Sequence, residues 1–258
     1  MSNAKVFLII SFILFNTFYF KSIAQSGNSI ANDCCTSLNN KYFKSYLTDS
    51  YDILTAPANW KGNDWIKFGS VTAIGSVLYW QDENIQQWSQ QLRNEPTDKI
   101  VKYGIEPWGN YYTIGLVAGI GIYGLAANDQ KSREVSLIAT KTLVITTAYS
   151  QLAKFLFQRH RPFQDTPPDA RRWEFFVNGI SDYKSFPSGH SVEAFAMATI
   201  FANAYKDRKA VPVIAYSMAS MVALSRIYDN KHWASDVFIG SAFGFFMGKL
   251  IYKNSTRQ

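Results

Sequence analysis

Long apolar stretches separated by short polar connections dominate the chain, and this alternation limits the folds open to it. The stretches span about residues 66–81, 111–127, 135–158, 190–205, 211–225 and 233–252. They are rich in Ala, Leu, Met, Ile and Phe and exceed the usual length of a strand, which favours helices. Residues 83–95 are typical of a polar amphipathic helix, and no strand-and-turn rhythm appears. The sequence therefore predicts an all-α domain, a helical bundle of about six main helices.

Composition and helix length bear on whether this bundle contacts a membrane. Hydrophobic residues make up 47% of the 258-residue chain and charged residues 17%, which excludes a disordered protein. Residues 111–127 form an uncharged run, about 25 Å of helix against a hydrocarbon core of about 30 Å. With a mean hydropathy of −0.11, the chain is expected to form buried helices of a membrane-associated or soluble domain. Full spanning stays open, because charges at helix ends can snorkel or line a polar site.

The charge balance indicates an anionic partner. The chain carries 26 Lys and Arg residues against 19 Asp and Glu, a net charge of +7, which suits phosphates, anionic lipids or nucleic acid. No Lys/Arg-rich run and no zinc-ligand spacing supports nucleic acid. We therefore expect a partner that carries phosphate or an anionic lipid head group, which includes a membrane surface or bilayer, and no nucleic acid.

Residues 1–24 have the pattern of a secretory signal peptide. Lys5 supplies the positive charge, residues 6–20 are strongly apolar, and Ser22 and Ala24 are small residues suited to a cleavage site. An uncleaved anchor helix is the alternative, although the apolar run is short for a membrane span. The pattern predicts export to the periplasm or cell envelope.

Residues 25–62 are polar and mixed, and we expect an extended or loosely helical lead-in to a helical domain at 63–252. The lead-in contains the two cysteines of the chain, Cys34 and Cys35. A ring closed between neighbouring cysteines is strained, and two residues make no metal site. We assign this pair no function beyond a possible cross-link between chains.

The first cluster of unusual polar residues runs from Lys154 to Pro162, at the end of an apolar helix. Lys154 and Arg161 are seven residues apart and so lie on one helix face, about two turns apart. Pro162 disfavours helix geometry at Arg161, which leaves the guanidinium free to fold toward a site. Taken alone, such a pair is most often a solvated basic face.

The second cluster is Phe186–His190, followed by an apolar helical run. Ser188 is suited to cap a helix, and Gly189 permits close backbone approach. A helix start of this kind directs free N–H groups and a positive dipole end at an anion. His190 lies in the first turn, where it could donate a proton to a bound group. Taken alone, the segment is an ordinary capped helix.

The third cluster runs from Ser225 to Asp236. His232 and Asp236 are four residues apart, which makes them neighbours on one helix face. A carboxylate there can accept the Nδ1 proton and leave the Nε2 lone pair free for attack. Arg226 adds a bidentate donor for phosphate. Taken alone, His232 and Asp236 are an ordinary surface pair.

Together the three clusters resemble the signature of the phosphatidic acid phosphatase type 2 / vanadium haloperoxidase superfamily. That signature is Lys-x6-Arg-Pro, then Pro-Ser-Gly-His, then Ser-Arg-x5-His-x3-Asp. Its fixed positions are met by Lys154, Arg161, Pro162, Pro187, Ser188, Gly189, His190, Ser225, Arg226, His232 and Asp236. The match covers about 136–250, whereas residues 25–110 carry no motif and leave substrate choice unsupported.

The resemblance implies a fold and a chemistry. The family has a helical bundle like that of acid phosphatases and haloperoxidases, and its phosphatases need no metal or other cofactor. Its second histidine attacks phosphorus, so His232 would form a phosphohistidine, with Asp236 orienting the ring. The first histidine, His190, would protonate the leaving alkoxide and then help to activate water. The phosphate would be held by Lys154, Arg161, Arg226 and the N–H groups of Ser188 and Gly189.

The resulting hypothesis is an exported, metal-independent phosphatase of a phosphate or diphosphate monoester, with an envelope lipid as substrate. Isoprenyl diphosphate, phosphatidate-type lipids and the lipid A phosphate stay open, as does a broad-specificity soluble acid phosphatase. A vanadate-dependent haloperoxidase is a rival, in which His232 would bind vanadium, although the chain is short for such enzymes. A non-enzymatic lipid-binding or membrane-structural protein is a second rival, but a binder has no use for a His232–Asp236 pair. The sequence leaves the oligomeric state open.

Overall fold

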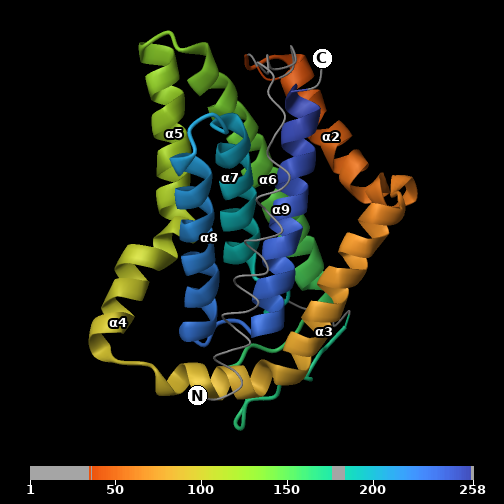
Figure 1. The fold of residues 1–258 in the computed structure, drawn as a ribbon, viewed down its shortest axis with the longest axis vertical. Helices are drawn as coiled ribbons and strands as arrows, with labels where there is room; N and C mark the ends of the chain where they lie inside the picture. The colour runs from red at the N-terminus through yellow and green to blue at the C-terminus, as the bar shows by residue number, and fades with distance from the viewer. Residues whose placement is uncertain (1–34, 36, 176–183, 257–258) are drawn as a thin grey trace. The chain divides into compact units, whose positions relative to one another are not determined.

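Each predicted apolar stretch forms a helix in the computed structural model, which describes Cys35, residues 37–175 and residues 184–256 (Figure 1). The long helices are α3 (Gly62–Gln91), α5 (Tyr111–Ala126), α6 (Gln130–Phe157), α7 (Gly189–Ala204), α8 (Ala210–Tyr228) and α9 (Ala234–Thr256). The others are α2 (Asn40–Thr55), the short α4 (Glu95–Ile100) and the turns η2 (Ala56–Asn59), η3 (Val101–Ile105) and η4 (Glu106–Gly109). Among these residues there is no β-strand, only an isolated bridge between Arg159 and Trp173. The all-α prediction is confirmed, whereas the expected signal at 1–24 and Cys34 lie outside the described residues.

The lead-in before residue 62 contains a regular helix, where an extended or loosely helical segment was expected. Asn39 caps α2, its side-chain oxygen accepting a hydrogen bond from the Tyr42 N–H at 2.8 Å. Tyr42, Ser45 and Asp49 are buried at helical spacing and therefore share one face of α2. This buried face could not be predicted from an apolar pattern, because two of its residues are polar. Ser45 and Asp49 form their hydrogen bonds inside the protein.

Helix α3 joins the predicted stretch 66–81 and most of the predicted helix 83–95 into one helix of 30 residues, which ends at Gln91. Its C-terminal half passes across the ends of α8 and α9 (Figure 1). There the Gln90 side chain donates a hydrogen bond to the Tyr228 carbonyl oxygen at 3.2 Å, and Gln86 donates to the Asn230 side chain at 2.9 Å. The polar half of α3 thus supports the connection between α8 and α9.

Helix α7 packs against α6, α8 and α9, and most of its residues are buried. Helix α9 approaches it closely at three glycines, Gly240, Gly244 and Gly248. A Cβ atom at Gly244 would lie 2.0 Å from the Val192 carbonyl oxygen, and one at Gly240 would lie 2.8 Å from the Ser188 carbonyl oxygen. Any larger residue would force the two helices apart. The glycines therefore hold the start of α9 against the start of α7.

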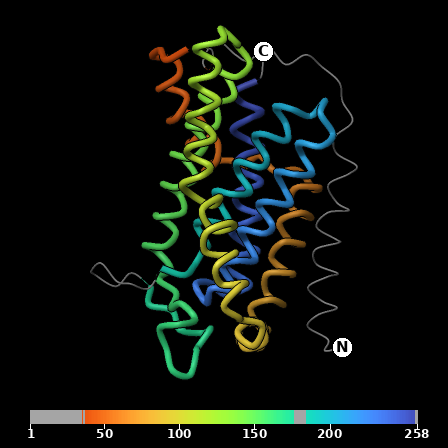
Figure 2. The backbone as a smooth tube through the Cα atoms, turned by 90° about the vertical axis from the view of Figure 1, so that its left-hand side faces the viewer, coloured from red at the N-terminus to blue at the C-terminus, as the bar shows by residue number. Residues whose placement is uncertain are grey.

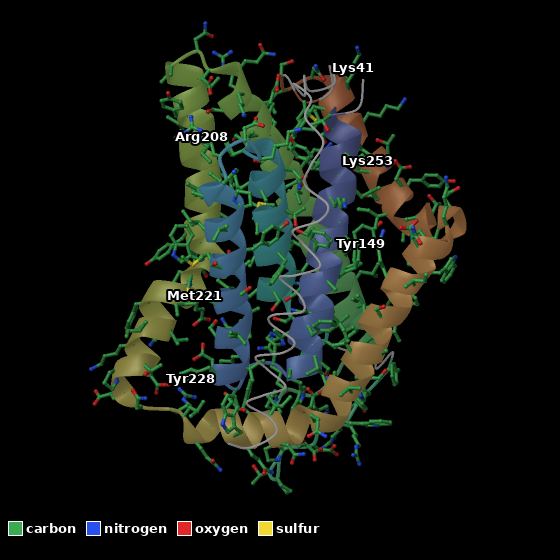
Figure 3. The ribbon with its side chains drawn as sticks, in the orientation of Figure 1. Lys41, Tyr149, Arg208, Met221, Tyr228 and Lys253 are labelled. Carbon is green, nitrogen blue, oxygen red and sulfur yellow. The ribbon has the colours of Figure 1, made fainter. Side chains whose placement is uncertain are left out.

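Large apolar side chains are exposed on several helices. On α5 and α8 they include Tyr111, Ile114, Ile122, Tyr123, Leu125, Val213, Ile214 and Leu224. By length and composition, α8 and α9 could each cross a membrane, and α9 is the more buried of the two. Exposed apolar faces of this extent are typical of contact with a membrane or a partner. In Figure 3, Tyr228 marks one end of the bundle, and Lys41 and Lys253 mark the other.

Candidate active site

The three predicted clusters lie at the end of the bundle that Tyr228 marks (Figure 3). Helices α6 and α8 end there, and α7 and α9 begin there. The connection between α6 and α7 extends from the same end (Figure 2). Because neighbouring helices run in alternate directions, segments that are far apart in the sequence meet at this shared end.

His232 lies buried in the connection between α8 and α9. Its Nδ1 atom is 2.7 Å from the backbone carbonyl oxygen of Ser185. A carbonyl oxygen only accepts hydrogen bonds, so Nδ1 carries the proton and Nε2 keeps its lone pair. The N–H groups of Lys231 and His232 donate to the Arg226 carbonyl oxygen at 3.0 and 3.1 Å, which fixes the connection. His232 is thus held in the tautomer that a nucleophile requires.

The electrostatic surroundings keep His232 neutral. Burial lowers its pKa well below the usual value of 6.5, and the charges of Arg161, Lys154 and Arg226, together with that of His190 when it is protonated, lower it further. These four residues come from all three clusters, so the structure brings the clusters together around one imidazole. The convergence that the motifs predicted is therefore present in the fold.

Asp236 reaches His232 through Ser185 instead of directly. The sequence predicted a contact across one helix face, but α9 begins at Ala234, so His232 precedes the helix. The Asp236 Oδ2 atom lies 4.0 Å from Nδ1 of His232. It accepts hydrogen bonds from the Ser185 hydroxyl at 2.5 Å and from the Trp233 N–H at 3.1 Å. Asp236 therefore anchors the segment whose carbonyl oxygen orients His232.

A buried arginine that the sequence analysis missed holds Asp236 in turn. Arg159 donates through Nη1 to Asp236 at 2.5 Å and through Nη2 to Asp82 at 2.7 Å. Asp82 also accepts from the N–H and the hydroxyl of Ser235, at 2.9 and 2.5 Å. The guanidinium lies over the Trp173 ring, 4.9 Å from its centroid. This network joins α3, the segment after α6 and the start of α9.

Lys154 lies in the last turn of α6, with its ammonium group against the start of α7. A Cβ atom at Gly189 would lie 3.1 Å from Nζ, so the glycine leaves room for this approach. Burial, followed by the charge of Arg161, lowers the pKa of Lys154 to about 8. The Arg161 guanidinium donates a long hydrogen bond of 3.5 Å to the Lys184 carbonyl oxygen. The Lys154 ammonium makes no hydrogen bond or ion pair with any other described residue, which suits it to hold an anion.

The start of α7 differs in one respect from the expected phosphate cradle. The Ser188 N–H is engaged, because it donates to the Asp236 carbonyl oxygen at 3.2 Å. The Ser188 hydroxyl accepts from the Ser191 hydroxyl at 2.9 Å. The first intrahelical hydrogen bond of α7 is donated by the Val192 N–H, so the N–H groups of Gly189, His190 and Ser191 precede it. These three N–H groups, with the Ser188 hydroxyl hydrogen, are the donors that this turn can offer an anion.

His190 occupies the first turn of α7 and is packed against η4. A Cβ atom at Gly109 would lie 2.6 Å from Cδ2 of the imidazole. Burial, followed by the charge of Arg226, lowers the pKa of His190 to about 4, while Glu106 acts in the opposite direction. His190 is therefore neutral at pH 7 in this state, and a dianion bound beside Arg226 would raise its pKa.

Arg226 is buried at the end of α8 between two carboxylates. Its Nη1 lies 2.8 Å from Glu106 and its Nη2 lies 3.3 Å from Asp229. Despite the short distance to Glu106, neither Nε nor Nη1 makes a hydrogen bond with a described residue. Buried guanidinium donors of this kind are suited to a phosphate oxygen.

Two further observations delimit the site. Among the described residues, no group of three or more His, Cys, Asp or Glu side chains could hold a metal ion.

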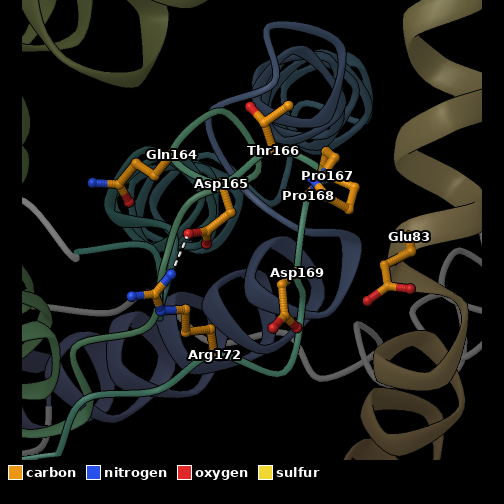
Figure 4. Close-up of a pocket in the computed structure, with 8 residues that line it drawn as sticks. All are labelled: Glu83, Gln164, Asp165, Thr166, Pro167, Pro168, Asp169 and Arg172. Carbon is orange, nitrogen blue, oxygen red and sulfur yellow. Dashed lines mark hydrogen bonds and ion pairs between the residues drawn. The ribbon is translucent and has the colours of Figure 1, made fainter.

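An open pocket lies on the segment that follows Arg161, and Figure 4 shows its lining residues with the 2.7 Å ion pair between Asp165 and Arg172. None of the predicted site residues lines this pocket, so it is separate from the cluster around His232.

Comparison with known proteins relates the motif-bearing half of the chain to one family. Residues 135–258 match the sequence model of the PAP2 superfamily. A lipid A 1-phosphatase of Porphyromonas gingivalis is 48% identical over 69 residues, 26% of this chain and 16% of that protein. A probable diacylglycerol pyrophosphate phosphatase 1 of Schizosaccharomyces pombe is 32% identical over 83 residues, 28% of this chain and 30% of that protein. The matches thus cover less than a third of the length of either relative, and the resemblance seen in the motifs is confirmed.

Two solved structures share the fold. One is a transmembrane PAP2 type phosphatidylglycerolphosphate phosphatase from Bacillus subtilis, with a TM-score of 0.51 and 20% identity, covering 70% of this chain and 92% of that one. The other is Aquifex aeolicus LpxE, with a TM-score of 0.50 and 19% identity, covering 66% of this chain and 93% of that one. At this level of identity the likeness concerns the fold alone.

Proposed function

We propose that this chain, whose residues 135–258 match the PAP2 superfamily, is an exported, membrane-associated phosphatase of a lipid phosphate. One observation carries the proposal. Cations from three segments surround His232, and the hydrogen bond from Nδ1 to Ser185 leaves the Nε2 lone pair free. A neutral nucleophile inside a ring of cations is what phosphoryl transfer requires. The names of the curated relatives support a lipid as the phosphate carrier.

Binding of the phosphate falls to the cationic groups of Lys154, Arg161 and Arg226. The Nε and Nη1 atoms of Arg226 make no hydrogen bond with a described residue, although Nη1 lies 2.8 Å from Glu106. A phosphate dianion would accept hydrogen bonds from these cationic groups and from the first turn of α7. The same negative charge would raise the pKa of His190 from about 4, so that this histidine carries a proton when substrate is bound.

The chemical step then uses two histidines on opposite sides of phosphorus. The Nε2 atom of His232 forms a bond to phosphorus while the bond between phosphorus and the leaving oxygen breaks. His190 gives its proton to that oxygen, and the alcohol departs. Water then attacks the phosphohistidine, His190 takes a proton from the water, and phosphate leaves with His232 restored. Positioning and charge stabilisation supply most of the catalysis in such reactions, so we propose that no metal takes part.

The signal-like pattern of residues 1–24 and the exposed apolar faces support the proposed location. The signal-like residues 1–24 support export to the cell envelope. The outward-facing apolar side chains of α5 and α8 support contact with lipid, beside a site that binds an anionic head group. The phosphate head group of a lipid could enter such a site while the apolar part of the lipid stays in the membrane.

The test is phosphate release by the full chain, purified in detergent, from a panel of esters. The panel holds a diacylglycerol phosphate, an isoprenyl phosphate, lipid A and a water-soluble phosphate ester. We expect release to be fastest from a lipid and to be abolished by His232→Ala. Equal release from the soluble ester would favour a broad-specificity acid phosphatase. Halide oxidation with added vanadate and no phosphate release would favour a haloperoxidase. If the protein shows neither activity, the result would favour a non-enzymatic lipid-binding protein.

A further inference from the structure

A carboxylate that the proposed chemistry does not use lies inside the site. Glu106 belongs to η4, the turn that precedes α5, and its side chain is 34% exposed. Its Oε1 atom lies 2.8 Å from Nη1 of Arg226. The same turn ends at Gly109, where a Cβ atom would lie 2.6 Å from the imidazole of His190. Glu106 is therefore placed where the substrate's phosphate and His190 meet.

The position of Glu106 along the reaction axis follows from its neighbours. Glu106 is one of the main charges acting on the pKa of His190, whereas the main charges acting on His232 are all positive. In an in-line displacement the attacking and leaving atoms lie on opposite sides of phosphorus. If His232 attacks and His190 protonates the leaving oxygen, as proposed above, Glu106 lies on the leaving-group side.

We propose that Glu106 determines specificity, making the site select lipid monophosphates, whose leaving group is an uncharged alcohol, over diphosphates of the same lipid. This inference rests on the proposed function. With a monophosphate, the breaking bond leaves an oxygen that takes the proton of His190 and departs as an alcohol. With a diphosphate, the departing oxygen belongs to a second phosphate, which stays negatively charged after that proton transfer. Its charge would lie beside the carboxylate of Glu106, and like charges so placed repel each other in a partly buried site.

Asp229 provides a matched control within the same ion-pair group. It contacts Arg226 through Nη2 at 3.3 Å, on the segment that follows α8. It carries the same charge as Glu106 but is not among the main charges that act on His190. Removing either carboxylate leaves Arg226 with less compensation. Only the removal of Glu106 changes the charge that faces the leaving group.

The experiment compares a diacylglycerol phosphate with the diphosphate of the same diacylglycerol, using the full chain in detergent micelles. Initial rates are followed by the lipid product, because the diphosphate yields the monophosphate. We expect the wild type to prefer the monophosphate in kcat/KM. Glu106→Gln should raise the ratio of diphosphate to monophosphate kcat/KM at least about tenfold. Glu106→Asp should keep the ratio of the wild type even where both rates fall, and Asp229→Asn should change both rates alike.

The outcomes separate this inference from the proposed function. An unchanged ratio in Glu106→Gln, with an active wild type, would overturn the inference and leave the phosphatase assignment standing. An equal rise in the ratio for Asp229→Asn would also overturn it, because the effect would then belong to the charge of Arg226. A wild type that releases phosphate from neither lipid would overturn both proposals. A general loss of folding would lower both rates without raising their ratio, so it cannot produce the result expected for Glu106→Gln.

Discussion

The Nδ1 atom of His232 lies 2.7 Å from the backbone carbonyl oxygen of Ser185, and this contact determines which ring nitrogen faces the cationic groups. Asp236 makes no hydrogen bond to the imidazole, its nearest oxygen lying 4.0 Å from Nδ1. It binds the Ser185 hydroxyl instead, and Arg159 and Asp82 hold Asp236 from behind. The orientation of His232 thus depends on a buried relay that ends in a backbone carbonyl group. A backbone acceptor cannot be protonated in the working pH range, so it keeps one tautomer more strictly than a carboxylate would.

We predict that Ser185→Ala lowers kcat about tenfold with little change in KM. The variant keeps the carbonyl oxygen that binds His232 but removes the hydroxyl that Asp236 accepts from at 2.5 Å. The segment is then less firmly positioned, which affects the reacting geometry more than phosphate binding. Steady-state kinetics with an aryl phosphate measure the effect.

The control for this prediction is Ser241→Ala, which removes a buried hydroxyl from the same region of the chain. The Ser241 hydroxyl donates within α9, to the Val237 carbonyl oxygen at 2.8 Å. Its loss costs about 1 kcal/mol of stability and leaves kcat unchanged. Equal kinetic effects of the two variants would show that the contact between Ser185 and Asp236 has no special part in catalysis.

The close approach of α9 to α7 gives a prediction about stability. Gly244→Ala should lower the melting temperature strongly, because the added Cβ would lie 2.0 Å from the Val192 carbonyl oxygen. We expect a loss of about 1–3 kcal/mol or more, since backbone atoms cannot yield as a flexible side chain does. Thermal unfolding in detergent measures it.

Gly119→Ala is the matched comparison, because a Cβ atom at Gly119 on α5 would meet nothing within 4 Å. Alanine favours helix over glycine by about 1 kcal/mol, so this variant should be neutral or slightly more stable. If Gly244→Ala has the same melting temperature as the wild type, α7 and α9 are not packed as described.

The charge around His190 predicts proton uptake when an anion binds. Burial and Arg226 hold the pKa of His190 at about 4 in the unliganded protein, so it is neutral at pH 6. A dianion beside Arg226 raises this pKa, which increases the protonated fraction and draws a proton from the buffer. Sulfate is a suitable probe, because it stays dianionic at this pH. Calorimetry in buffers of different ionisation enthalpy should show uptake in the wild type and none in His190→Asn. Sulfate binding without proton uptake in the wild type would contradict the proposed role of His190.

The motif residues could be predicted because helix ends fix them locally. Lys154 lies in the last turn of α6, and Ser188 to His190 lie at the start of α7. The prediction that Lys154 and Arg161 share one helix face was wrong, because α6 ends at Phe157, four residues before Arg161. The prediction that His232 and Asp236 lie on one helix face was wrong, because α9 begins two residues after His232.

The supporting residues could not be predicted in the same way. Arg159 and Asp82 lie 77 positions apart, and each looks like a surface charge when only its own segment is considered. Glu106 sits in a polar segment with no periodicity, and Ser185 acts mainly through its backbone. Such contacts depend on how helices that are distant in the sequence pack together, so they cannot be predicted from a local sequence pattern.

The central claim is that His232 is the nucleophile and His190 the proton donor, and trapping the covalent intermediate tests it most directly. In His190→Ala, nitrophenyl phosphate should still react, because nitrophenolate leaves with little help, whereas attack by water is slowed. Rapid quenching of this variant at neutral or higher pH, followed by peptide mass spectrometry, should find an acid-labile phosphate on His232. The double variant His190→Ala/His232→Ala should carry none. Phosphate on another residue, or turnover of nitrophenyl phosphate by His232→Ala at the rate of the wild type, would contradict the account.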